Sequence, residues 1–281
     1  MDNWPESCCG WWILRKMKHG LKMNTENGVG MKDFTVKSYS VLLDSLIEAG
    51  YEFQTFTDYL AAPLERVVIL RHDVDKRPEN SLCFAELEHA KQLKASYFFR
   101  VVPESLQPDK LLAIAKMGHE IGYHYEDMDL AKGDLKAALE SSIRNLQLLR
   151  RLAPIDTICM HGSPLSKYDN KELWRHYDYR EYGIIGEPYF DLDYSKIFYI
   201  TDTGRKWNNT EASIRDKVDS AFQIEVKSTA HFIELLKKGA MPDKMMINTH
   251  PQRWNDGWLL WGRELVGQSV KNQIKKVISR R

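Results

Sequence analysis

The chain has 281 residues, of which 43% are hydrophobic and 28% are charged. This balance is typical of a globular enzyme and excludes a disordered or fibrous protein. Lysine and arginine number 40 against 39 acidic residues, so the net charge of +1 gives no overall field that would indicate nucleic acid or an acidic polymer as a partner.

Residues 1–30 show no sustained hydrophobic period, and we expect a disordered extension there, followed by a single domain over residues 31–281. The short apolar patch Trp11–Leu14 comes before Arg15 and Lys16, which is the wrong charge order for a secretory signal. No apolar run approaches the roughly 20 residues that a membrane span needs. We therefore expect a cytoplasmic protein without stable insertion into a membrane.

From residue 31 onward, the hydrophobic pattern predicts a helix followed by a regular alternation of strands and helices. The first helix is expected over Val36–Gly50, where apolar residues recur at helical spacing and a glycine stands at the end. The predicted strands are Val67–His72, Ser96–Arg100, Glu120–His124, Thr157–His161, Gly183–Gly186, Lys196–Asp202 and Met245–His250. The predicted helices among them are Pro78–Leu93, Pro108–Met117, Gly133–Leu152 and Thr229–Lys238, and the region from Trp258 is mostly helical.

Apolar strands that alternate with helices indicate a parallel sheet covered by helices. About seven such units without an internal boundary favour one α/β domain, a closed or nearly closed (β/α) barrel, over two domains. A doubly wound open sheet is the structural alternative.

Acidic and histidine side chains stand at the ends of several predicted strands. They are Asp73, Asp75, His124, His161, Asp202 and His250. In a parallel barrel these ends share one rim, which is where such folds place their chemistry. Any one of these residues could be structural, since a lone aspartate is often a helix N-cap, but their combination indicates a site. His119 begins its strand about 16 Å from His124, on the opposite rim, and is expected to be structural.

Aspartate and histidine ligands with open coordination positions suit a divalent ion such as Zn²⁺, which polarises a carbonyl and acidifies water. A second aspartate can take the proton of that water, and a histidine across the rim can protonate the leaving group. This set of groups is suited to hydrolysing an amide or an ester. The sequence has no phosphate-binding glycine loop, nucleophile elbow or dinucleotide fingerprint.

Three segments, Ile69–Asp75, Gly118–His124 and Met246–His250, resemble motifs of the polysaccharide deacetylases, the NodB-homology or carbohydrate esterase family 4 group. The resemblance covers about Leu64 to Trp254, and the order of the motifs is more specific than any one of them. It implies a deformed (β/α) barrel with about seven parallel strands, and a metal-dependent carbohydrate N-deacetylase.

The same resemblance implies roles for individual residues. Asp73 would be the catalytic base, and Asp75 and His124 would bind a divalent metal, with Zn²⁺ expected first and Co²⁺, Ni²⁺ or Mn²⁺ as alternatives. His250 would be the general acid, oriented by Asp202.

One departure concerns the metal. The family places a second histidine four residues after His124, where this chain has Met128, and a thioether is a poor ligand for zinc or a hard metal. His161, Glu126 or Asp127 could complete the shell, or the metal could be bound weakly or not at all. We favour His161 because it ends an adjacent strand.

A second departure concerns an arginine. The third motif normally supplies one, and the segment MHGSP here has none. Arg71 and Arg100 stand at strand ends and could pair with Asp73 instead. Together with Trp207, which lies in the segment DTGRKW of the fourth motif, they are our candidates for the substrate-binding side of the site.

The longer segments RHDVD, MHGSPLSKYDN and HPQRW resemble a subfamily associated with surface-glycan biosynthesis. For a cytoplasmic enzyme, this resemblance implies a nucleotide-linked or lipid-linked amino sugar as substrate. Two alternatives remain, an inactive carbohydrate-binding protein and a metal-independent hydrolase of a small cyclic amide. Retention of both Asp73 and His250 favours an enzyme.

The C-terminal segment from Trp258 to Arg281 combines apolar residues at helical spacing with five basic residues near its end. We expect a helix that packs on its own domain. Peripheral contact with an anionic bilayer, which would suit a lipid-linked substrate, is the alternative.

Overall fold

The computed structural model describes residues 32–163, 166–207, 218–259, 261, 262, 264, 265 and 267. The predictions for residues 1–30 and for the basic end of the C-terminal segment lie outside these residues. From 258 to 267 the described residues are helical, as expected. Among the helices that the structure describes, none has the length and apolar character needed to cross a membrane.

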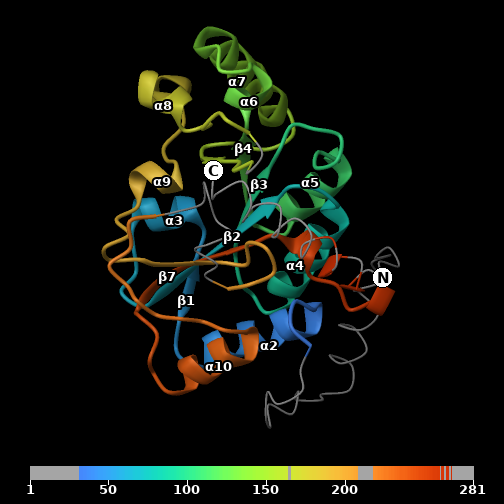
Figure 1. Cartoon of the computed structure of the whole chain (residues 1–281), viewed down its shortest axis with the longest axis vertical. Coiled ribbons are helices and arrows are strands. Elements are labelled where there is room, and N and C mark those ends of the chain that lie inside the picture. The colour runs from blue at the N-terminus through green and yellow to red at the C-terminus, as the bar shows by residue number, and fades with distance from the viewer. Residues whose placement is uncertain are drawn as a thin grey trace.

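Seven parallel strands form one sheet, which curves through the centre of the molecule (Figure 1). They are β1 (Glu52–Gln54), β2 (Val67–Val74), β3 (Ser96–Phe99), β4 (Glu120–Tyr125), β5 (Ile158–Met160), β6 (Phe198–Thr201) and β7 (Lys244–Thr249). Their order in space is β5-β4-β3-β2-β7-β6, with β1 paired to the first half of β2. Going around the sheet, β2, β3, β4 and β5 follow one another in chain order, and β6 and β7 lead back to β2 in the same direction. A doubly wound sheet would instead reverse its strand order at a switch point. The prediction of a deformed (β/α) barrel is therefore confirmed.

Beyond β5, one further segment of the chain pairs with the sheet, at a single residue. The predicted strand Gly183–Gly186 is reduced to a single parallel bridge between Gly186 and Thr157. Beyond that bridge, no strand pairing in the described part of the chain joins this segment to β6. The barrel is consequently open between Gly186 and β6.

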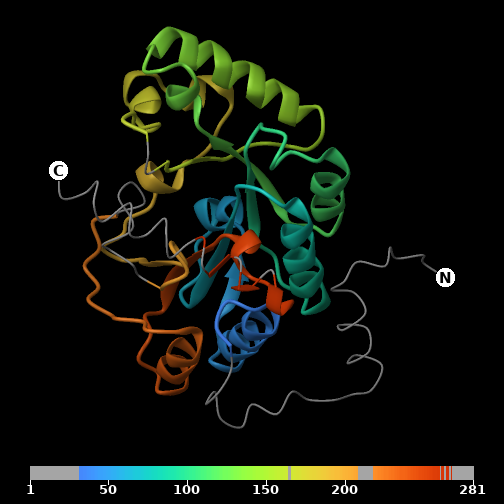
Figure 2. The ribbon, with the colours of Figure 1, turned by 45° about the vertical axis from the view of Figure 1, so that its right-hand side comes forward.

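Helices cover the outside of the curved sheet, as Figure 1 and the turned view in Figure 2 show. They are α2 (Val36–Glu48), α3 (Phe56–Ala61), α4 (Pro78–Ala90), α5 (Pro108–Lys116), α6 (Asp127–Leu130), α7 (Leu135–Arg150), α8 (Glu172–His176), α9 (Pro188–Asp191) and α10 (Thr229–Lys237), with 3-10 turns η1 (Tyr179–Tyr182) and η2 (Pro251–Arg253). Local chemistry sets their starts. Thr35 and Ser38 form a capping box on α2, and proline occupies the first turn of α4 and α5, where no backbone donor is needed.

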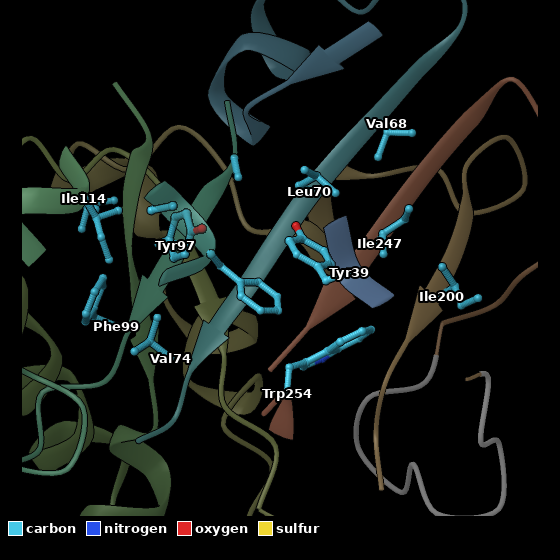
Figure 3. Close-up of a cluster of buried hydrophobic side chains, with 14 of the residues drawn as sticks. Tyr39, Val68, Leu70, Val74, Tyr97, Phe99, Ile114, Ile200, Ile247 and Trp254 are labelled. Carbon is cyan, nitrogen blue, oxygen red and sulfur yellow. The ribbon is translucent and has the colours of Figure 1, made fainter. Parts of the chain in front are cut away.

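Strand β2 is buried along its whole length, and its side chains alternate between two packed layers. Val68, Leu70 and Val74 face the outer layer, where they meet the helices together with Tyr39 and Trp254 (Figure 3). Ile69 belongs instead to an inner cluster that fills the barrel, with Phe56, Phe98, Cys159, Leu192, Tyr194, Ile197, Tyr199 and Met246. Since the strand period is two, the odd-numbered residues that follow Ile69 also face inward.

Close packing inside the barrel requires a glycine on β4. A Cβ atom at Gly122 would stand 2.4 Å from the ring of Phe98, a distance that no methyl group tolerates. The glycine thus lets β3 and β4 close around the inner cluster, two residues before His124.

A buried polar network lies in the outer layer behind the sheet. The carboxylate of Glu88 is 2.7 Å from His72 Nε2 and accepts hydrogen bonds from the hydroxyls of Tyr39 and Tyr97. His119, expected to be structural, joins this layer, where its Nδ1 accepts from the Ala95 amide and its Nε2 lies 3.1 Å from the Ala85 carbonyl oxygen. None of these groups faces the rim that carries the candidate site.

Candidate active site

The predicted site residues meet at the carboxyl ends of the strands. Asp73 lies near the end of β2, and Asp75 follows it. His124 lies on β4, His161 follows β5, and His250 follows β7. Side chains from separate parts of the sequence therefore meet in one cluster at this rim of the barrel, where Asp73 faces inward like Ile69 on the same strand.

Asp75, His124 and His161 form a compact group of donor atoms. Asp75 Oδ1 lies 3.6 Å from His124 Nε2 and 3.5 Å from His161 Nε2, and all three donor atoms are within 4.8 Å of one another. Asp75 Oδ1 is buried and has no hydrogen-bond partner among the described residues. His124 Nδ1 lies 2.9 Å from the Cys159 carbonyl oxygen, an arrangement that leaves Nε2 available as a ligand. One carboxylate oxygen and two imidazole nitrogens suit a divalent transition metal such as zinc.

A second set of donors, Asp73, His124 and Cys159, also converges. Both carboxylate oxygens of Asp73 are already engaged by the Arg71 guanidinium. We therefore consider the Asp75 group to be the better candidate for a cation.

The structure distinguishes the three candidates for the place left by Met128. Met128 itself is buried in the outer hydrophobic cluster, and Asp127 accepts hydrogen bonds from Tyr123, Ser141 and Asn145. Glu126 Oε2 lies 3.2 Å from His161 Nδ1 on the far side of the imidazole from Asp75. Only His161 places a donor atom beside Asp75 and His124.

Glu126 is a supporting residue of this group. Burial would raise the pKa of its carboxyl, but the neighbouring His161 and Arg100 outweigh it and lower the pKa to about 2. The same carboxylate raises the pKa of His161 against the opposite effect of burial. Glu126 is consequently ionised at neutral pH and lies behind the imidazole that faces Asp75.

Asp73 is held by three donors. Arg71 Nε and Nη2 donate to its two oxygens at 2.9 and 2.8 Å, and Asn248 Nδ2 donates to Oδ2 at 3.0 Å. Burial would raise the pKa of Asp73, but Arg71, with His124 and His250, holds it well below its ordinary value. Asp73 Oδ2 lies 3.8 Å from His124 Nε2 and 3.9 Å from His250 Nε2. The ionised carboxylate of Asp73 thus lies between the group formed by Asp75, His124 and His161 and the imidazole of His250.

His250 is fixed by Asp202. Its Nδ1 lies 2.6 Å from Asp202 Oδ1, and its backbone amide donates to Oδ2 at 3.0 Å. Arg253 and Trp254 also donate to the Asp202 carboxylate, at 2.8 and 2.7 Å. Burial would raise the pKa of Asp202, but His250 and Arg253 lower it. With Nδ1 turned toward Asp202, the opposite nitrogen Nε2 faces Asp73 and Asp75.

Two residues from the predicted substrate side lie elsewhere. Arg100 pairs with Glu126 rather than with Asp73, donating at 3.0 and 2.7 Å, because β3 directs it toward the chain that follows β4. Trp207 is only 4% exposed and packs against Phe34 and Trp254 in the outer core. Trp207 therefore lies in the core of the structure, which argues against a role in substrate binding, and Arg100 takes a supporting role beside Glu126. Arg71 does pair with Asp73, as expected.

A groove of about 380 Å³ lies next to α9 and the chain that follows it. Its walls include Lys171, Tyr189, Phe190 and Tyr194. The Tyr189 hydroxyl accepts from Arg71 Nη1 at 3.4 Å, so one wall of the groove contacts the arginine that holds Asp73. Sequence reasoning missed this wall because α9 is a single turn of four residues that has no hydrophobic period.

No protein-family model and no curated protein sequence matches this chain. Among solved structures, the chain is similar to a mutant of the peptidoglycan deacetylase PdaC from Bacillus subtilis. The TM-score is 0.36 and the sequence identity 15%, over 78% of this chain and 98% of that one. This similarity is too low to assign a family or an activity to the chain.

Proposed function

We propose that this chain is a metal-dependent hydrolase that removes an N-acyl group, in the first place acetyl, from an amino sugar. One observation supports this above all. The ionised Asp73 carboxylate lies 3.9 Å from the Nε2 atom of His250 and 3.8 Å from that of His124, beside an Asp-His-His cluster suited to a divalent ion. A base, an acid and a cation site therefore surround one small volume, the arrangement that amide hydrolysis needs.

Asp75, His124 and His161 would hold the ion, with zinc as the first expectation and Co²⁺, Ni²⁺ or Mn²⁺ as alternatives. When bound, it would polarise the acyl carbonyl and make water more acidic. The second nitrogen of each histidine already faces a carbonyl or a carboxylate oxygen, which orients the ring toward the shared centre.

Asp73 is proposed as the general base. Its low pKa means that it is ionised at neutral pH, and Arg71 and Asn248 fix the orientation of its carboxylate. It can take a proton from the attacking water while the carbonyl carbon becomes tetrahedral.

His250 is proposed as the general acid. Its Nε2 atom faces Asp73 and Asp75, while Asp202 Oδ1 lies 2.6 Å from its Nδ1 atom and fixes the orientation of the ring. Protonation of the sugar nitrogen by Nε2 allows the carbon–nitrogen bond to break, and an amine and a carboxylate leave.

The groove is proposed as the place where the sugar and its carrier bind. Tyr189 and Phe190 offer rings on which a sugar face can stack, and the Lys171 ammonium lies 5.0 Å from the Tyr189 ring centre. Arg175 and the carboxylates of Asp193 and Asp219 also line the groove. A cation next to aromatic rings suits the phosphate of a nucleotide-linked or lipid-linked amino sugar. Such precursors are made in the cytoplasm, which is the location we propose.

The test is a measurement of released acetate with zinc-loaded protein and a panel of N-acetylated amino sugars, free, nucleotide-linked and lipid-linked. We expect release from at least one of them, with loss of activity in Asp75→Ala and a loss of at least about a hundredfold in Asp73→Asn. Asp73→Asn should keep its metal by elemental analysis, because Asp73 is not one of the proposed ligands. Sugar binding without any acetate release would show that the chain binds carbohydrate and is not an enzyme.

A further inference from the structure

The side chain of Gln252, in the turn η2, reaches back to Asp75. Its Nε2 atom donates to Asp75 Oδ2 at 3.0 Å, and the residue is only 2% exposed. Its Oε1 atom is buried and finds no hydrogen-bond partner in the described ranges of the chain. A buried amide that uses its donor on one carboxylate and leaves its acceptor unsatisfied calls for an explanation, because such atoms are rarely left unpaired.

The two oxygens of Asp75 are thereby made different from each other. Oδ2 accepts the hydrogen bond from Gln252, whereas no residue that the structure describes makes a hydrogen bond to Oδ1. Oδ1 is also the oxygen that lies 3.6 and 3.5 Å from the Nε2 atoms of His124 and His161. The contact with Gln252 thus turns one chosen oxygen toward the two imidazoles.

The main chain around Asp75 is fixed independently of this contact. Its amide donates to the Asp73 carbonyl at 3.1 Å, and its carbonyl accepts from Arg100 Nη1 at 3.1 Å. The remaining freedom is rotation of the carboxylate, and within the part of the chain that the structure describes Gln252 makes the one hydrogen bond to a carboxylate oxygen of Asp75. A neutral amide has a further advantage here, since an ammonium or guanidinium in its place would repel a bound cation.

We infer that Gln252 is a positioning residue for the metal-binding carboxylate of Asp75, an inference that rests on the proposed function. The same turn also serves the other half of the site, because Arg253 donates to Asp202 and thereby supports His250. Two consecutive residues, Gln252 and Arg253, consequently tie the orientation of the metal ligand to that of the acid.

The experiment measures the affinity of the whole protein for Zn²⁺ in competition with a chromophoric chelator. Two variants remove the contact in different ways. Gln252→Met keeps the length of the side chain without its polar atoms, and Gln252→Asn keeps the amide on a chain too short to reach Asp75. Loss of a group that orients a metal ligand typically weakens binding about 10–100-fold, and we expect both variants to fall in that range.

Asn80→Ala is the matched control. Asn80 Nδ2 donates to the carbonyls of Pro251 and Trp254 and to Asn255 Oδ1, so this change loosens the turn without removing any bond to Asp75. We expect its zinc affinity to stay close to that of the parent. A second readout is the visible spectrum of the Co²⁺-loaded proteins, which reports the ligand geometry directly. The spectrum should change in the Gln252 variants, where the carboxylate can rotate, and not in Asn80→Ala.

Parent-like zinc affinity in both Gln252 variants would overturn the inference, and so would an equal loss in Asn80→Ala, which would reduce Gln252 to a structural part of the turn. A parent protein that binds no more zinc than Asp75→Ala would remove the metal site itself. If the parent binds zinc through Asp75 but releases no acetate, the proposed reaction fails while the role of Gln252 stands on the affinities.

Discussion

Arg71 and Asp73 lie two positions apart on β2, and their side chains form a buried, two-point ion pair inside the barrel. Arg71 Nε and Nη2 donate to Asp73 Oδ1 and Oδ2 at 2.9 and 2.8 Å, and the arginine is only 1% exposed. The candidate base therefore carries its own counter-ion. Its ionised state is maintained by the chain itself and does not depend on a metal held by Asp75.

Replacement of Arg71 by methionine should shift the acidic limb of the pH–rate profile. Burial alone would raise the pKa of Asp73, and Arg71 is the largest of the influences that lower it. Without the guanidinium the carboxyl takes up a proton at higher pH, so kcat/KM should begin to fall at a higher pH than in the parent. Arg71→Lys, which keeps the charge, should shift the limb less. An unchanged limb in Arg71→Met would mean that Asp73 is not the base.

His250 and Asp202 should act as a unit in turnover. His250→Ala removes the proposed proton donor, so it should lose at least about a hundredfold in kcat with little change in metal content. Asp202→Asn leaves the imidazole in place but removes a carboxylate oxygen that faces its Nδ1 atom at 2.6 Å. This variant should also lower kcat, and the double variant should be no slower than His250→Ala alone. Parent-like kcat in Asp202→Asn would contradict this pairing.

Glu187 should make stability depend on pH. It is fully buried beside the Met160 and Tyr189 amides and the Tyr125 hydroxyl, and burial raises its pKa to about 7 from an ordinary value of 4.5. A folded-state pKa above the unfolded one gives stability that is complete below pH 4.5 and is lost as the pH rises through 7. The loss should be roughly 3 kcal/mol in the free energy of unfolding.

Glu187→Gln is the comparison for that measurement. Urea unfolding of both proteins between pH 4 and pH 8 should show the difference in stability moving in favour of the variant as the pH rises. The absolute stabilities can differ, because an amide cannot accept from both backbone groups. A pH-independent difference would mean that the carboxyl titrates normally.

Trp207 should matter for folding rather than for substrate. Its indole packs against Phe34, Phe232 and Trp254, and Nε1 donates to Thr229 Oγ1 at 3.1 Å. Trp207→Ala should lower the free energy of unfolding by about 3–5 kcal/mol. At a temperature where the variant is folded, KM should remain near the parent value. A large rise in KM without loss of stability would restore the substrate-binding role.

Much of the fold was predictable, because buried parallel strands form runs of apolar and β-branched residues that the sequence makes visible. The missed elements are short. Strand β1 has three residues and α3 has six, too few for either to show a period. The predicted strand Gly183–Gly186 has strand-like composition but forms only one bridge, since the chain turns into η1 just before it and into α9 just after.

The site was predictable where it depends on strand ends and not where it depends on side-chain direction. The position of Asp75 and His124 at one rim follows from the parallel topology. The contacts of Arg100 and Trp207 do not follow from that topology, because the position of a residue in a motif does not show which way its side chain points. Gln252 was missed for a related reason, since its partner Asp75 lies 177 residues earlier in the chain.

His72 stands between Arg71 and Asp73 and points out of the barrel, toward Glu88 and Thr249. Moving β2 by a single residue would bring this imidazole inside and send both the arginine and the aspartate among the helices. If the proposed function holds, a compact misfolded form with such a slip would have no hydrolase activity, because the proposed base would lie outside the barrel. Specific activity per milligram of purified protein could therefore serve as an assay of correct folding, more sensitive than circular dichroism, which would record the same helices and strands in either arrangement.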